Sequence, residues 1–178
     1  MRRAILLLGG SLAVLALFFL HLGFAYILPH PYQFANVLLA GLVLMLMATN
    51  SGKIVWIAAA LYWCLELYTV TEFGVVFMSG TLSMLATYWL YRSLITNRTL
   101  PAVAALAATS LIGYRVSYTI GLLIVDQAPA DWGAYAITLG WELFMTVSLT
   151  TILFVILRRW LRSLRTDRAT RSINWYVR

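Results

Sequence analysis

Charged residues are scarce in this sequence of 178 residues, which holds 13 Lys and Arg and only 6 Asp and Glu. Together they make up 11% of the chain, whereas a soluble domain carries roughly 25% charged residues. Hydrophobic residues make up 62%, and the mean hydropathy is +0.86. The shortage of charge excludes an ordinary soluble domain, and we expect an integral membrane protein.

Cysteine and histidine are nearly absent as well. The single cysteine, Cys64, has no partner for an internal disulfide, and one cysteine with two histidines makes no metal cluster. We therefore expect no metal and no cofactor, and we expect Cys64 to fill space in the core. The H-E-x-x-H, G-x-S-x-G and P-loop motifs are missing too. Because no catalytic set is left, we expect that the protein is not an enzyme.

Long apolar runs stand in place of these features. A hydrocarbon core of about 30 Å requires about 20 apolar residues in a helix, and six runs approach that length. They cover residues 4–28, 32–47, 53–69, 73–95, 101–125 and 134–157. Turn-forming stretches such as "PHPY" and "DQAPADWG" separate them. The sequence predicts an all-α polytopic membrane protein, with a six-transmembrane-helix bundle over residues 1–157.

The basic residues indicate how this bundle is oriented. With the N-terminus in the cytoplasm, every Lys and Arg except Arg115 falls on the cytoplasmic side. On the opposite side, the Lys, Arg, Asp and Glu residues outside the spans are all acidic: Glu72, Asp126 and Asp131. Cytoplasmic loops of membrane proteins carry such an excess of positive charge. We therefore expect both termini in the cytoplasm.

The C-terminal residues 158–178 form a basic tail. In the stretch "LRRWLRSLRTDR" the apolar residues share one helical face and the arginines occupy the other. The basic positions of interest are Arg158, Arg159, Arg162 and Arg165. This pattern is typical of a helix that lies in the headgroup region of a bilayer. We expect lipid as its partner and no nucleic acid, because no folded basic domain follows.

Three charged residues lie inside the predicted spans: Glu66, Arg115 and Glu142. At 1.5 Å per residue, each lies roughly 20–23 Å from the cytoplasmic end of its helix. An isolated charge at such a depth costs about 2.5–3.5 kcal/mol or more. We therefore expect Arg115 to pair with Glu66 in the first place and with Glu142 in the second. His21 and Tyr118 are close enough in depth to join this predicted polar layer.

Three interpretations of the polar layer stay open. It can be an internal staple that fixes how the helices pack, since a buried pair requires matched partners. It can be the polar floor of a cavity that opens to the outer side. It can also belong to a proton or ion path, although transporters usually place such residues at broken helices near the midplane.

The segment "LELYTVTEFGVVFMSGTLSMLATYWLYRSLITN", residues 65–97, resembles the third and fourth helices of the MreD family of bacterial rod-shape-determining membrane proteins. In that family an acidic residue near the end of the third helix precedes by eight positions a glycine that opens the fourth. Glu66 and Gly74 have this spacing, and Phe73 takes the place of a leucine. Residues 69–72 depart from the Ser-Gly-Ser-Pro run of the family.

The resemblance implies a multi-pass protein of the bacterial inner membrane with no enzymatic activity. It implies a scaffold in the cell-elongation and cell-wall machinery, with a partner on the periplasmic side that is similar to MreC. The MreD family is also thought to share its fold with the substrate-binding S-components of vitamin transporters. An S-component-like subunit for a small solute is therefore the alternative, although the first run lacks the A-x-x-x-A docking motif of those subunits.

Overall fold

The computed structural model of the chain describes the backbone of residues 2–69, 72, 74–93 and 99–173. It describes the side chains of residues 11–12, 14–69, 72, 74–93 and 99–159. Across this part of the chain the regular structure consists of six α-helices and one 3-10 helix, with no strand. The predicted all-α class is confirmed.

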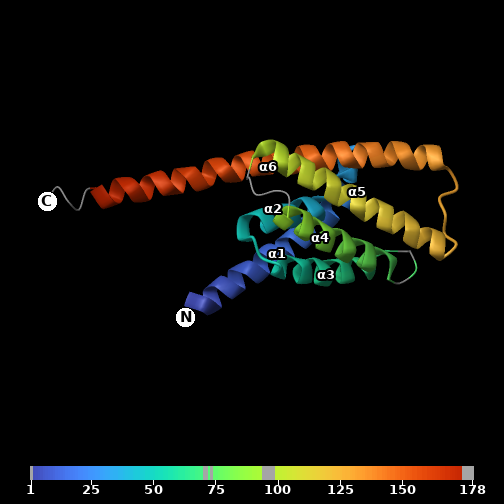
Figure 1. Cartoon of the computed structure of the whole chain (residues 1–178), viewed down its shortest axis with the longest axis horizontal. Coiled ribbons are helices and arrows are strands. Elements are labelled where there is room, and N and C mark those ends of the chain that lie inside the picture. Colours follow the sequence, from blue (N-terminus) through green and yellow to red (C-terminus); the bar gives the residue numbers. More distant parts are fainter. Residues whose placement is uncertain (1, 70–71, 73, 94–98, 174–178) are drawn as a thin grey trace.

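Each predicted run corresponds to one α-helix, and the second run also holds the 3-10 helix. The elements are α1 (Arg2–Ile27), η1 (Tyr32–Phe34), α2 (Val37–Thr49), α3 (Lys53–Glu66), α4 (Val75–Ser93), α5 (Leu100–Ile124) and α6 (Trp132–Ile173). Figure 1 shows that α3 meets α4, and α5 meets α6, at one end of the bundle, while both termini lie toward the other end. The helices therefore alternate in direction, as an up-and-down bundle with short connections requires.

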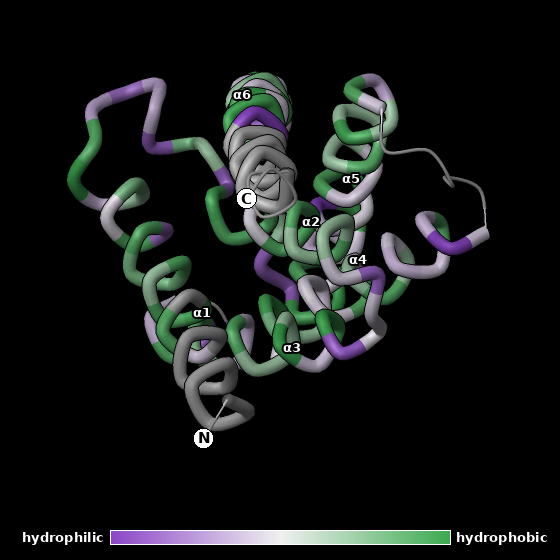
Figure 2. Tube along the Cα trace, turned by 90° about the vertical axis from the view of Figure 1, so that its left-hand side faces the viewer, coloured by the Kyte–Doolittle hydropathy of each residue, from purple (hydrophilic) through white to green (hydrophobic). Residues whose placement is uncertain are grey.

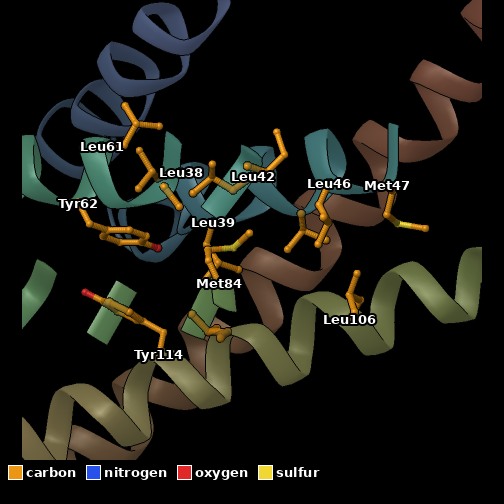
Figure 3. Close-up of a cluster of buried hydrophobic side chains, with 14 of the residues drawn as sticks. Leu38, Leu39, Leu42, Leu46, Met47, Leu61, Tyr62, Met84, Leu106 and Tyr114 are labelled. Carbon is orange, nitrogen blue, oxygen red and sulfur yellow. The ribbon is translucent and has the colours of Figure 1, made fainter. Parts of the chain in front are cut away.

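Helix α2 is the centre of the bundle. It contacts α1, α3, α5 and α6, and Figure 2 shows the other helices around it. Eight of its 13 residues are buried. In Figure 3 Leu39 lies above Met84 of α4, whereas Leu106 of α5 lies below Leu46 and Met47. The apolar core thus lies along α2.

Helix α2 begins at Val37, later than the predicted start at residue 32. The Oδ1 atom of Asn36 accepts a hydrogen bond from the N–H of Leu39 at 3.1 Å, which satisfies a donor that the first turn leaves unpaired. The helix ends at Thr49 and is followed by Asn50, whose φ of 51° is left-handed. With 13 residues, α2 is about 20 Å long, which is shorter than the hydrocarbon core of a bilayer.

Helix α6 is longer than predicted, because it continues past residue 157 to Ile173 without a break. No Gly or Pro occurs between these positions, so nothing in the local sequence interrupts the helix. In Figure 1 its C-terminal part projects from the bundle. The predicted boundary between bundle and tail therefore falls within one continuous helix. The side chains of Arg162 and Arg165 lie outside the described residues.

Among the residues whose side chains the structure describes, two helical stretches are long and apolar enough to cross a membrane, Leu100–Ile124 and Trp132–Arg159. The apolar stretches Val14–Ile27 and Val37–Thr49 are shorter. This finding agrees with a membrane-associated protein.

Large apolar side chains cover much of the outer surface. On α5, the exposed fractions of Ile112, Val116 and Ile120 are 48%, 53% and 51%. These positions are four residues apart, so they form one stripe along the helix. Cys64 is also exposed, and the prediction that it fills the core was wrong. It lies on the outward face of α3, beside Trp63, which is exposed as well.

Candidate functional site

An ion pair between α5 and α6 forms the centre of the candidate site. The Nε atom of Arg115 donates to the Oε2 atom of Glu142 at 2.5 Å, and its Nη2 atom contacts the same oxygen. The side chain of Glu142 is 5% exposed and that of Arg115 is 22% exposed. A charge held this far from water requires a partner. Arg115 is therefore paired with Glu142, which the sequence analysis placed second after Glu66.

Asn36 connects this ion pair to the start of α2. Its Nδ2 atom donates to the other oxygen of Glu142, Oε1, at 3.5 Å. Its backbone N–H donates to the Oγ1 atom of Thr146 at 2.9 Å. Both Asn36 and Thr146 are buried. Because Asn36 also caps α2, this one residue connects the central helix to both Glu142 and Thr146 of α6.

Aromatic rings flank the guanidinium. The ring centroids of Tyr114 and Tyr118 lie 5.7 and 5.6 Å from the Cζ atom of Arg115, which is within cation–π range. The Tyr114 ring is stacked on Tyr118 and, on its other side, on Tyr62 of α3, with centroid distances of 6.0 and 5.6 Å. The stack extends from the ion pair into the core and joins α5 to α3.

Glu66 has a different partner from the one predicted. Its Oε1 atom accepts from the N–H of Gly74 at 3.0 Å, and its Oε2 atom accepts from the N–H of Phe77. These amides belong to the start of α4, where the helix dipole favours a negative charge. The carboxylate of Glu66 is satisfied by backbone, so the predicted pair with Arg115 was wrong. Gly74 has a φ of +105°, a conformation that favours glycine.

The contact between Glu66 and α4 gives a testable expectation. Replacing Glu66 with Gln removes the charge and one acceptor oxygen, and is expected to lower the free energy of unfolding by about 1–2 kcal/mol. Chemical unfolding in detergent micelles measures the change. Glu72→Gln is the matched control, because Glu72 is exposed and lies in the same connection. Equal effects of the two variants would show that the capping contact contributes nothing.

Two cavities border the ion pair, and His21 of α1 lines both of them. The first has a volume of about 250 Å³ and is lined by residues that include His21, Tyr68, Arg115 and Tyr118. The second has a volume of about 170 Å³ and lies beside η1, where Gln33 and residues of the ion pair line it. The Nδ1 atom of His21 is buried and has no hydrogen-bond partner among the described residues.

The structure brings four of the five predicted polar residues to one place: His21, Arg115, Tyr118 and Glu142. Asn36 and Thr146 belong to the same network and were not predicted. Signals for both existed: Asn36 precedes an apolar run, as an N-cap does, and Thr146 lies four residues after Glu142, on the same helical face. Arg158 and Arg159 lie elsewhere, on α6 beside the first residue of α5.

The polar groups at the centre of the site bind one another. Within the described residues, no group of three or more His, Cys, Asp or Glu side chains can hold a metal ion. The carboxylate of Glu142 accepts from Arg115 and Asn36, so each of its two oxygens has a partner within the fold. Comparison of the chain with protein-family models, with curated proteins and with solved structures found no match.

Proposed function

We propose that the chain is a six-span protein of the bacterial inner membrane with both termini in the cytoplasm. The exposed apolar stripe of α5 supports this placement, since a soluble monomer rarely exposes large contiguous apolar surface. Exposed tryptophans support it further: Trp56 and Trp89 lie near the end of the bundle that holds the termini, and Trp132 begins α6 at the other end. Tryptophan is enriched at both interfaces of a membrane.

Within that membrane, we propose that the protein is a non-enzymatic scaffold subunit similar to MreD, which binds a partner on the periplasmic side in cell-wall elongation. The hydrogen bond between Glu66 and Gly74 carries this proposal. These are the two positions on which the resemblance rests, and their spacing of eight residues has a physical reason. An acidic residue at the end of one helix caps the next, and the glycine supplies the turn.

The cavity volumes favour a scaffold over an S-component-like subunit. Sites for drug-sized ligands usually measure about 300–1,000 Å³, whereas the two cavities beside Arg115 measure about 250 and 170 Å³. The ion pair between them is neutral overall and already has its partners. The polar layer is therefore interpreted as a staple that holds α2, α5 and α6 together.

Depletion of the protein in the bacterium that encodes it tests the scaffold. Cells that lose the protein are expected to lose their rod shape, and the tagged chain is expected to co-purify with a membrane-anchored protein that faces the periplasm. A tagged membrane protein of similar size and expression level is the control. Unchanged cell shape together with a retained small molecule, whose addition raises the melting temperature in proportion to its concentration, would favour the solute-binding alternative.

A further inference from the structure

A cavity of about 160 Å³ lies where α5 begins, beside residues 154–159 of α6. It is lined by Leu100 of α5 and by Phe154, Val155, Arg158 and Arg159 of α6. Three of these side chains are apolar and two are cationic. The cavity therefore offers an apolar wall next to two neighbouring guanidinium groups, which is the chemistry of a lipid with a negatively charged headgroup.

The two arginines have no anionic partner among the described side chains, where the ion pair between Arg115 and Glu142 is the one salt bridge. Both are exposed. Among the described acidic residues, Glu66 and Glu142 have partners within the fold. Asp126 and Asp131 lie in or near the α5–α6 connection, which Figure 1 shows at the opposite end of the bundle. Among the described side chains, none compensates the positive charge at this cavity.

The position of the cavity along α6 matches the edge of a bilayer. The apolar run of α6 ends at Leu157, and Arg158 and Arg159 are the first cationic residues after it, as is typical of the cytoplasmic end of a membrane span. Phe154 and Val155, about one turn earlier, lie on the hydrocarbon side of that edge. The backbone of α5 starts beside them, and the positive end of its dipole adds to the charge of the arginines. Guanidinium groups bind phosphate through paired hydrogen bonds.

We propose that this cavity binds one anionic phospholipid, with its phosphate between Arg158 and Arg159 and an acyl chain against Leu100 and Phe154. The inference rests on the membrane placement proposed above. It differs from attraction of the whole basic tail to a charged surface, because it assigns the lipid to one place and predicts one molecule bound per chain. Bound there, the lipid joins the start of α5 to the end of the membrane-spanning part of α6.

Native mass spectrometry of the full chain in detergent tests the site. Phosphatidylglycerol is expected to form a one-to-one complex, and phosphatidylcholine with the same acyl chains is expected to bind much more weakly. The double variant Arg158→Gln with Arg159→Gln is expected to bind phosphatidylglycerol about thirtyfold more weakly. Because both side chains are exposed, its melting temperature in lipid-free detergent is expected to stay unchanged.

The matched control is the double variant Arg162→Gln with Arg165→Gln, which has the same net charge and is expected to change the affinity less than about threefold. Equal losses in the two double variants would overturn the proposal and assign the binding to the tail as a whole. Absence of any preference for phosphatidylglycerol in the unaltered chain would overturn it as well. So would equal stabilisation by inorganic phosphate alone, since the occupant would then be a soluble anion.

Flotation with phosphatidylcholine vesicles separates failure of the site from failure of the membrane placement. A chain that inserts into these vesicles but shows no preference for phosphatidylglycerol lacks the lipid site and keeps its proposed place in the membrane. A chain that does not insert would contradict both the lipid site and the proposed membrane placement.

Discussion

Replacing Arg115 with Leu is expected to lower the free energy of unfolding by about 3–5 kcal/mol, because the carboxylate of Glu142 is then buried without its cation. Glu142→Leu is expected to cost a similar amount, since it leaves the guanidinium without an anion. The double variant, with Leu at both positions, is expected to recover much of the loss, because neither charge remains. Denaturant titration in detergent micelles measures all three.

The control for these three variants is the combination of Arg115→Leu with Glu66→Leu. Glu66 caps the start of α4 and has no hydrogen bond with Arg115 among the described contacts, so the two effects are expected to add within about 0.5 kcal/mol. A double variant at Arg115 and Glu142 that loses the full sum of its single variants would show that the two residues are not coupled. The interpretation as a staple would then fail.

Replacing Gly80 with Leu is expected to destabilise the fold by about 3 kcal/mol, because it packs extra volume into a filled core. A Cβ atom at this position in α4 would overlap the ring of Tyr62. The Tyr62 side chain is 1% exposed and stacks on Tyr114, so it has little room to move. The close approach of α4 to α3 depends on a residue without a side chain.

Gly140→Leu is the matched control for Gly80→Leu. Gly140 also lies in a helix, but a Cβ atom there meets nothing within 4 Å. Leu favours helix over Gly by up to about 1 kcal/mol, so this variant is expected to be neutral or more stable. Thermal unfolding followed by circular dichroism measures both variants. If Gly80→Leu and Gly140→Leu have the same melting temperature, the contact between Gly80 and Tyr62 does not limit packing.

The two expected destabilisations have a common structural origin. The ion pair and the tyrosine stack form one continuous path, from Glu142 through Arg115 and Tyr114 to Tyr62. This path joins α6 to α3 across α5. Helices in lipid gain little from the hydrophobic effect, and they rely on close packing and polar contacts to stay together. For a protein placed in the membrane, such a path is a means of fixing the bundle.

The sequence by itself was enough for the class and order of the elements. Apolar runs bounded by turn residues predicted six helices, and the limits of α1, α4 and α5 lie within two residues of their predicted limits. This worked because helix length and helix breaks are local properties. The later start of α2 is local too, since it follows from the capping side chain of Asn36.

The partner of Arg115 required the tertiary structure. A rise of 1.5 Å per residue gives the height of a side chain on its helix. That height made both Glu66 and Glu142 candidates, and the sequence analysis placed Glu66 first. It does not give the direction in which the side chain points or the helix that it meets. Only the packing of α5 against α6 brought Glu142 to the guanidinium, while the turn at Gly74 brought the amides of α4 to Glu66. Composition and periodicity determined that charges buried at this depth need partners, and the arrangement of the helices decided which partners they have.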